Sequence, residues 1–399
     1  MHQGHHPPAL PETHYLDNRI FTDEAIFREE QERILSKVWQ FVCHESEVAN
    51  TGDYRRTSVA GKPVVVVRDT DGQIRGFYNV CRHRGAEVVR AESGNARSFT
   101  CFYHHWTYSL DGTLRAVAKP EGYERAGLDK SGLGLVAVRT ECIAGLVFMC
   151  LDPDCEPLKD FLGDSIAPVI EPLATVPMEV FHFHKAIVHT NWKLWQDNNS
   201  ERYHSMLHAI NRATQPWVLG KTSPMKLRLF PNAHSGYWSD GEATVAYERG
   251  GYADVTRGGT LPGLRDNEMR VLNLFPDLMI NIRSNVVRLD RMIPLDANRT
   301  LVEWRGLGVK GDSEEMRALR LKHHNMFWGP AGRNLPEDLL AVESQYRSMQ
   351  ADAVRYSILA REEDLNPTDD ANLRAYYAEW GRRMHRSAAA PFAAANGGV

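Results

Sequence analysis

The chain of 399 residues lacks the features that would place it in a membrane, on a nucleic acid or in a disulfide scaffold. No apolar run approaches the roughly 20 residues that a membrane-spanning helix needs. Basic residues number 47 and acidic residues 51, so a net charge of −4 offers no surplus for nucleic acid or anionic lipid. Six cysteines are too few for a disulfide scaffold, and the His- and Pro-rich start is not a signal peptide. We therefore expect a cytoplasmic globular protein.

What the sequence does contain is two short cysteine–histidine pairs, Cys81-Arg82-His83 and Cys101-Phe102-Tyr103-His104, with 17 residues between them. Two thiolates and two imidazoles suit an iron–sulfur cluster in which two cysteines hold one iron and two histidines hold the other. Structural zinc accepts the same ligand types. Zinc fingers usually place both cysteines before both histidines, whereas here each pair runs Cys then His. The order therefore favours the cluster.

The residues around these pairs make the signal more specific. Cys81 opens C-R-H-R-G, and Cys101 opens C-F-Y-H-H-W. With these neighbours the chain resembles the Rieske iron–sulfur domain, and in particular the Rieske non-haem iron oxygenases, over residues of about 15 to 385. The resemblance implies a [2Fe-2S] cluster held by Cys81, His83, Cys101 and His104. The other cysteines, Cys43, Cys142, Cys150 and Cys155, are expected to be small, buried, reduced residues.

Hydrophobic patterning divides the chain into regions. Thr22 is expected to cap a helix that begins at Asp23, within an N-terminal helical segment of residues 1–39. The β-branched run 64–67 and the turns at 71–72 and 111–112 then indicate a small β-domain over residues 40–155. Later, strands are expected at 180–187, 227–230, 269–281 and 301–306, and helices at 313–325 and 335–360.

The resemblance supplies the fold class, which is α+β. A small all-β Rieske domain would be joined to a catalytic domain of residues 156–385, a helix-capped antiparallel sheet of the helix-grip kind. The segment 1–39 would pack on that catalytic domain. Residues 386–399 are small and polar enough to form a flexible tail.

A second set of chemically useful residues lies in the stretch 191–208. If this stretch is helical, Glu201, His204 and His208 share one face, since they are three and four residues apart. Two histidines and one carboxylate with open positions are what a non-haem Fe(II) oxygenase uses to bind oxygen. Taken alone, two histidines on a helix are more often surface or core residues than metal ligands.

The resemblance gives these residues roles. Asn-Trp-Lys at 191–193, an acid three residues before a histidine, and a second histidine are similar to the family's mononuclear iron signature. His204 and His208 would then bind iron. Glu201 would lie between the cluster histidine of one subunit and the iron histidine of the next. The family usually has Asp at this position, and a Glu resembles the branch that oxidises quaternary amines.

The third iron ligand should be an acid far downstream. The segment Gly329-Pro330-Ala331-Gly332, followed by Glu337 and Asp338, resembles the family's G-P-A-G segment and its paired acids. The second acid is the ligand there, which implies Asp338, with Glu337 as the neighbouring alternative. A helix start at 336–338 with no role in metal binding is the other interpretation.

The implied activity is that of an oxygenase component with a Rieske cluster and a mononuclear Fe(II). Residues 132–137 fit a dinucleotide fingerprint only nominally, so electrons would come from an NAD(P)H-dependent reductase, directly or through a ferredoxin. The resemblance implies a homotrimer, with or without a small β-subunit (α3β3), acting on O2 and a small organic substrate. An aromatic acid is favoured, with Met206, Leu207, Trp217 and Phe230 as pocket candidates. A quaternary-amine monooxygenase or demethylase is the rival enzyme, and an electron carrier the rival without catalysis.

Overall fold

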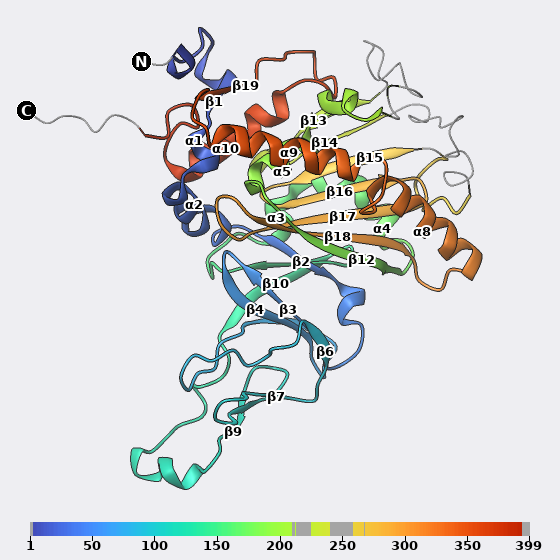
Figure 1. Ribbon diagram of the computed structural model, residues 1–399. Coiled ribbons are helices and arrows are strands. Elements are labelled where there is room, and N and C mark those ends of the chain that lie inside the picture. The colour runs from blue at the N-terminus through green and yellow to red at the C-terminus, as the bar shows by residue number, and fades with distance from the viewer. Residues whose placement is uncertain (1–2, 210–211, 213–224, 240–257, 267, 393–399) are drawn as a thin grey trace, which may run out of the picture. The chain divides into compact units, whose positions relative to one another are not determined.

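The computed structural model describes residues 3–209, 212, 225–239, 258–266 and 268–392 (Figure 1). The chain forms two compact units, one of residues Leu35–Leu158 and the other of Met1–Ile34 together with Lys159–Val399. Both contain antiparallel sheets, and the second also carries most of the helices, so the predicted α+β class is confirmed. In the described part of the chain, no helix is long and apolar enough to cross a membrane.

The smaller unit is an antiparallel β-domain. Its seven-stranded sheet has the order β2-β11-β10-β5-β4-β3-β6, and a separate three-stranded sheet has the order β7-β8-β9. The strands are β2 Gln40–His44, β3 Asp53–Val59, β4 Lys62–Arg68, β5 Ile74–Tyr78, β6 Ser93–Asn95, β7 Phe99–Thr100, β8 Thr107–Tyr108, β9 Leu114–Ala116, β10 Ala137–Ile143 and β11 Leu146–Cys150.

The β-branched run at 64–67 explains why β4 lies inside this sheet. Successive side chains of a strand point to opposite faces. Val64 and Val66 therefore enter one core with Val147, while Val65 and Val67 enter a second core that contains Cys81, Cys101 and Trp106. All four valines are fully buried. One face of this apolar strand thus packs against the cysteine loops, and the other face packs in the second core of the same unit.

The larger unit is built on a second seven-stranded antiparallel sheet of order β12-β18-β17-β16-β15-β14-β13. Its strands are β12 Met178–Val188, β13 Lys226–Leu229, β14 Ser235–Trp238, β15 Met269–Leu274, β16 Leu278–Arg283, β17 Val286–Pro294 and β18 Thr300–Val309. A two-stranded sheet pairs β1 Tyr15–Asp17 with β19 Tyr356–Ile358. The N-terminal segment therefore contributes a strand to the same unit as the distant residues 356–358.

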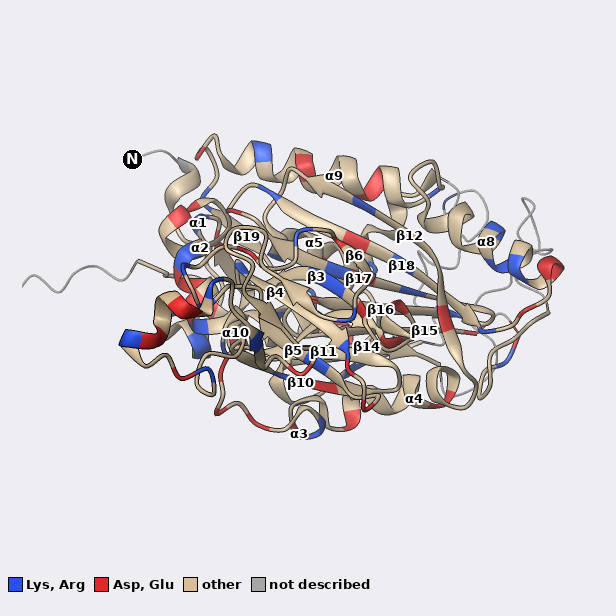
Figure 2. Ribbon diagram, turned by 90° about the horizontal axis from the view of Figure 1, so that it is seen from below, with Lys and Arg blue, Asp and Glu red and all other residues tan. Residues whose placement is uncertain are grey.

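The described residues also form α-helices. They are α1 Arg19–Thr22, α2 Glu24–Glu30, α3 Leu158–Leu162, α4 Ala167–Ala174, α5 Trp192–Ser200, α8 Glu314–Trp328, α9 Leu335–Met349 and α10 Ala371–Met384. Helices α5 and α8 pack on the sheet, and α9 and α10 pack on α5 (Figure 1). Figure 2 shows acidic and basic residues interspersed along the helices, without a long run of one sign.

Several predicted boundaries are wrong, each for a local reason. Asp23, not Thr22, caps α2, because its carboxylate accepts hydrogen bonds from the amides of Ala25 and Ile26. The strand predicted at 269–281 is the hairpin of β15 and β16, which turns at Phe275-Pro276-Asp277. The helix predicted at 335–360 ends at Met349, and residues 356–358 form β19 instead.

Two further predictions, on the burial of the remaining cysteines and on the C-terminal tail, can be compared with the structure. Cys142 is exposed and Cys155 half-buried, so only Cys43 and Cys150 of the four remaining cysteines are buried as expected. Residues 386–392, within the segment predicted as a tail, make contacts. The carbonyl of Ala388 accepts a hydrogen bond from the amide of Asp17 at 3.0 Å, and Ala388 itself is buried.

Candidate metal centres

The two cysteine–histidine loops have the same backbone frame. In the first, the amide of Cys81 donates to the carbonyl of Ala86, and the amide of Gly85 donates back to Cys81. In the second, the amide of Cys101 donates to the carbonyl of Trp106, and the amide of His105 donates back to Cys101. Each loop is thus a closed turn of six residues that begins at its cysteine.

This frame explains a glycine of the motif. The fifth residue of each loop has a left-handed backbone, with φ of +79° at Gly85 and +56° at His105. Glycine adopts this conformation without strain, and histidine is one of the few other residues that are enriched in it. The histidines of the predicted ligand set come from the third position of the first loop, His83, and the fourth position of the second, His104.

The donor atoms of the loops converge. His83 Nδ1 lies 3.1 Å from His104 Nδ1. Two ligands of one tetrahedral ion with bonds of about 2.0–2.1 Å are about 3.3 Å apart, so this spacing suits a shared iron. Cys81 and Cys101 are buried, while both histidines are half-buried. The donor set fits a cluster whose cysteine side faces the core and whose histidine side faces outward.

Aromatic side chains surround the donors. Tyr108 places its hydroxyl 3.3 Å from Cys81 Sγ and accepts a hydrogen bond from the amide of Arg82. The indole of Trp106 stacks on His83 with ring centroids 4.8 Å apart. Burial, together with the neighbouring His104 and Arg84, lowers the pKa of His83. This shift favours the neutral imidazole, which is the form that binds metal.

The second group of residues begins at α5. Asn191 caps this helix, because its side-chain oxygen accepts hydrogen bonds from the amide and from the ammonium of Lys193. Lys193 also pairs with Glu30 of α2 at 2.7 Å, and Trp192 donates to the same carboxylate. The Asn-Trp-Lys motif thus fixes the start of α5 against α2.

The helix expected to carry Glu201, His204 and His208 together is shorter than predicted. It ends at Ser200, and Glu201 is extended with φ of −111° and ψ of 156°. A 3₁₀ turn, η7 Tyr203–Met206, then contains His204. The carboxylate of Glu201 accepts a hydrogen bond from the amide of His204, which links the 3₁₀ turn to the residue at which α5 has ended. The acid and the histidines therefore meet through a change of direction rather than on one helix face.

The structure nevertheless brings the predicted ligands together. His204, His208 and Asp338 each offer one atom within 4.8 Å of the others. Asp338 Oδ1 lies 3.7 Å from Nε2 of His204 and 3.4 Å from Nε2 of His208. Asp338 reaches this point from the first turn of α9, so both earlier interpretations of 336–338, a helix start and a ligand position, describe the same residues.

Each histidine also has a carboxylate on its other nitrogen. Glu201 lies 2.7 Å from Nδ1 of His204, and Glu337 lies 2.8 Å from Nδ1 of His208. Carboxylates in these positions set the orientation and tautomer of metal-binding histidines. Sequence reasoning treated Glu337 as an alternative ligand and missed this arrangement. The adjacency of two acids was its only signal, and adjacency does not say which way each side chain points.

The electrostatics of the group fit a cation between these side chains. Burial opposes a charge on His204, but the carboxylates of Glu201 and Asp338 raise its pKa to about 9. Burial also raises the pKa of Asp338, against the lowering effect of both histidines. Two imidazoles and a carboxylate with open positions are typical of Fe(II) sites that bind oxygen. The residues therefore form a candidate mononuclear iron site.

A small pocket of about 70 Å³ adjoins the three residues. Its described lining includes three arginines, Arg202, Arg283 and Arg288, together with the aromatic rings of Tyr237 and Trp328. None of the predicted pocket residues Met206, Leu207 and Phe230 is among the described lining residues. Phe230 instead stacks on Trp238. The fourth predicted residue, Trp217, lies outside the described residues.

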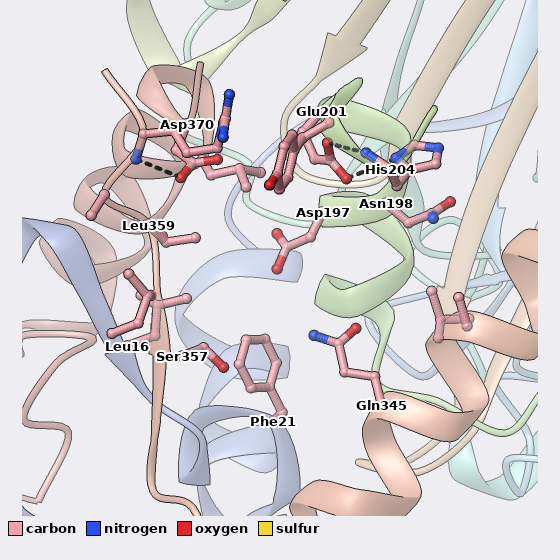
Figure 3. Close-up of a pocket in the computed structure, with 17 residues that line it drawn as sticks. Leu16, Phe21, Asp197, Asn198, Glu201, His204, Gln345, Ser357, Leu359 and Asp370 are labelled. Carbon is pink, nitrogen blue, oxygen red and sulfur yellow. Dashed lines mark hydrogen bonds and ion pairs between the residues drawn. The ribbon is translucent and has the colours of Figure 1, made fainter. Parts of the chain in front are cut away.

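A larger hollow of about 570 Å³ lies beside Glu201 (Figure 3). Asp197, Asn198, Glu201 and His204 approach it from α5 and the turn that follows, and Asp370 and Leu359 from the C-terminal part of the chain. Burial raises the pKa of Asp197 to about 7, although Tyr377 donates to its carboxylate. The carboxyl groups of Asp197, Glu201 and Asp370 thus line part of this hollow, together with apolar side chains and Arg361.

Comparison with known proteins matches both parts of the chain. The Rieske [2Fe-2S] domain family matches residues 38–126, and the ring hydroxylating alpha subunit (catalytic domain) family matches residues 173–384. The chain is 41% identical over 383 residues to the 2-aminobenzenesulfonate 2,3-dioxygenase subunit alpha of an Alcaligenes species, covering 96% of each chain.

One further relative and one solved structure agree with this match. Over 396 residues, the chain is 37% identical to the methanesulfonate monooxygenase hydroxylase subunit alpha of Methylosulfonomonas methylovora, covering 96% of this chain and 94% of that one. The structure of naphthalene 1,2-dioxygenase from a Rhodococcus species bound to indole superposes with a TM-score of 0.77, at 23% identity over 93% of this chain and 94% of that one, which bears on the fold. The chain therefore belongs to the alpha subunits of the Rieske-type ring-hydroxylating oxygenases.

Proposed function

We propose that this oxygenase subunit hydroxylates a small aromatic acid, with a sulfonate as the preferred anionic group. The observation that carries this proposal is the set of three arginines that line the pocket beside His204, His208 and Asp338. Guanidinium groups bind the oxygens of carboxylates and sulfonates through charge-assisted hydrogen bonds. The two relatives compared by sequence have a sulfonate in their names, one aromatic and one aliphatic.

The arginines are held in different ways. Arg288 pairs with the buried Asp290 at 2.6 Å and donates to Asn199, so it is anchored behind the pocket. Arg283 is half-buried, and its guanidinium lies 5.3 Å from the ring centroid of Trp328. Because Arg283 lines the pocket and is more exposed than the buried Arg288, it is our choice for the residue that contacts the substrate anion.

The same contacts argue against a quaternary amine. Such a substrate needs an aromatic cage whose open ring faces receive the cation. Here the guanidinium of Arg202 lies over Tyr237 at 5.5 Å, and those of Arg283 and Arg288 lie within 5.3 Å of the Trp328 ring centroid. Cations already occupy the aromatic faces that a cage would offer.

Within this proposal the chain's own residues divide the work. His204, His208 and Asp338 would hold Fe(II), which supplies oxygen activation when bound. Glu201 and Glu337 orient the two imidazoles by accepting hydrogen bonds at Nδ1. The arginines place the anionic end of the substrate, and the aromatic walls exclude water.

Electrons would come from a separate reductase and would enter through the Cys81–Cys101 loops. We infer that the receiving iron site belongs to the next subunit of a homotrimer. The cluster loops expose the large apolar side chains of Phe102 and Tyr103, at 53% and 56%, beside exposed arginines. The hollow at Glu201 contains both apolar side chains and the carboxyl groups of Asp197, Glu201 and Asp370, which supports docking of the apolar and basic cluster loop of a second copy there.

Turnover with purified protein, iron and a surrogate reductase tests the substrate class. We expect oxygen consumption and a hydroxylated product with 2-aminobenzenesulfonate, less with benzoate-like acids, and none with carnitine. Arg283→Gln should lower kcat/KM for the sulfonate by about 10–100-fold, since losing a charged hydrogen bond costs about 1.5–3 kcal/mol.

Arg299→Gln is the matched control, because Arg299 is half exposed and pairs only with Asp296 among the described residues. It should leave kcat/KM unchanged. Turnover of carnitine with no turnover of aromatic acids would reject the proposed substrate. Full activity of Arg283→Gln would reject its role while leaving the substrate class standing.

A further inference from the structure

A second cluster of possible metal ligands lies away from the iron site. His182, His184 and His324 each offer one ring nitrogen within 4.8 Å of the others. The first two are alternate residues of β12 and therefore project from the same face of the strand. The third comes from α8, which packs on that sheet. None of the three lines the pocket beside the iron site.

Five of the six ring nitrogens of this cluster are buried without a hydrogen-bond partner among the described residues. They are Nδ1 and Nε2 of both His184 and His324, and Nε2 of His182. His324 is fully buried. Buried polar groups of folded proteins almost always have hydrogen-bond partners. A group of buried nitrogens that lie close together without partners therefore indicates a bound ligand.

The chain makes room for this arrangement. Gly306 of β18 is the cross-strand partner of His182. A Cβ atom at this position would lie 3.0 Å from Nδ1 of His324 and 3.1 Å from the ring of Phe181. The absence of a side chain at 306 is therefore what lets the His324 ring approach the strand.

The protonation state is right for metal binding. Burial, with His182 and Arg288 nearby, lowers the pKa of His184 to about 4, and burial lowers that of His182 as well. Burial also lowers the pKa of His324 well below the ordinary value, with the neighbouring histidines and Arg288 adding to the effect. All three rings are neutral near pH 7. The positive charge of Arg288 is balanced by its ion pair with Asp290.

We propose that His182, His184 and His324 form a second metal site, which takes a borderline transition-metal ion of the Zn²⁺ class. Three imidazoles without a carboxylate suit such an ion and not Mg²⁺ or Ca²⁺, which prefer oxygen ligands. Tetrahedral Zn²⁺ bound by three histidines keeps its fourth position for water. Ligand nitrogens of a tetrahedral ion lie about 3.3 Å apart, so modest ring rotations bring the three together.

The site has a structural consequence. It joins β12, an edge strand of the sheet, to α8. Helix α8 ends at Trp328, whose ring lies 5.5 Å from that of His324 and also lines the arginine pocket. A metal ion here would fix the end of α8 on which one wall of that pocket depends.

Crystals of the intact protein soaked in Zn²⁺ test the proposal directly. Diffraction data above and below the zinc edge should show an anomalous peak between the three rings, separate from any peak at His204 and His208. A peak at the iron site with none between His182, His184 and His324 would overturn the proposal.

Equilibrium dialysis against Zn²⁺ with metal analysis gives the stoichiometry in solution. His324→Gln should bind about one Zn²⁺ fewer per chain than the wild type, with the Rieske absorbance unchanged. His189→Gln, at an exposed histidine just beyond β12, is the matched control and should lose none. If His324→Gln does not fold, the half-buried His184→Gln serves instead, and Gly306→Ala should weaken binding by crowding His324. Equal zinc content in the wild type and the folded variant would reject the site.

Discussion

At the scale of the residue, the feature that most distinguishes the iron site is the pair of carboxylates behind its histidines. Asp338 faces Nε2 of both rings, while Glu337, the next residue, turns to Nδ1 of His208. Two adjacent acids at the start of α9 therefore have different tasks. One would bind the metal, and the other positions a ligand by holding its tautomer.

This division predicts the effect of Glu337→Gln. An amide can still fill the space but accepts the His208 hydrogen bond without a charge, so the affinity of the site for Fe(II) should fall by about 10–100-fold. Iron titration monitored by metal analysis measures the change, and the visible absorbance of the cluster should be unaffected. Glu343→Gln on the same helix, whose carboxylate accepts from the amide of His189, is the control. Unchanged iron affinity in Glu337→Gln would contradict the positioning role.

Sequence reasoning reached some of these residues and not others for a physical reason. The spacing of His204 and His208, and of the two cysteine–histidine pairs, is local, so it could be recognised without a fold. Glu337 and the arginines of the pocket come together only through the folded sheet. Their types are common on any surface, and nothing in the local sequence separates Arg283 from the other arginines.

A second prediction at this scale concerns pH. Asp277 is buried in the turn between β15 and β16, and its Oδ2 has no hydrogen-bond partner among the described residues. Burial raises its pKa from 3.8 to about 7, although Arg291 acts in the opposite direction. The folded protein therefore holds this proton more tightly than the unfolded chain. The resulting stabilisation is present at low pH and is lost as the pH rises from about 4 to 7.

Asp277→Asn should remove the fall in stability that ionisation of Asp277 causes as the pH rises. The free energy of unfolding of the variant, relative to the wild type, should increase with pH by up to about 1.4 kcal/mol per pH unit over that window. Denaturant unfolding at pH 5 and pH 7.5, followed by tryptophan fluorescence, gives both values. Asp71→Asn, on an exposed turn, is the comparison. A difference between variant and wild type that does not change with pH would refute the assignment.

At the scale of the element, α5 is the part of the fold that positions the iron site. Its start is fixed by Asn191 and Lys193, and its end at Ser200 leads directly into Glu201 and the turn of His204. Lys193 and Glu30 are both fully buried and pair at 2.7 Å. Trp192 and Trp380 also donate to Glu30, so α2, α5 and α10 meet at one carboxylate.

Glu30→Gln should therefore destabilise the larger unit by about 3–5 kcal/mol, because it leaves a buried ammonium without its counter-ion. Thermal or denaturant unfolding measures the loss, and metal analysis of the folded fraction should show reduced iron. Arg299→Gln, which removes an exposed ion pair, should cost less than about 1 kcal/mol. Equal stability of the two variants would show that the Glu30 pair does not hold α5 in place.

The elements themselves were predictable to different degrees. The valine run of β4 was visible as a strand because it is buried on both faces. The end of α5 was not, because the sequence from 191 to 208 contains no proline or glycine that would stop a helix. The break after Ser200 instead accompanies the hydrogen bond from the amide of His204 to Glu201, which is a feature of the site and not of helix propensity.

At the scale of the whole molecule, the path of the electron matters: a cluster can reduce the iron site of its own chain or that of a neighbouring copy. The two units are each compact, and the cluster histidines and the hollow at Glu201 both face outward. The exposed Arg82 and Arg84 of the cluster loop and the carboxyl groups that line part of the hollow carry opposite charges. We infer that each copy uses its neighbour's cluster.

Subunit mixing tests this inference. Cys101→Ser removes a cluster ligand and His208→Ala removes an iron ligand, so each variant alone should be inactive. In a trimer that contains both variants, the His208→Ala chain has an intact cluster and the Cys101→Ser chain has an intact iron site. Electrons that pass between subunits can then travel from the first chain to the second. Co-expression should then restore a fraction of wild-type turnover. Mixing Cys101→Ser with Cys81→Ser, which leaves no intact cluster, should restore none. Zero turnover in mixed trimers that retain both iron and cluster absorbance would place electron transfer within a single chain.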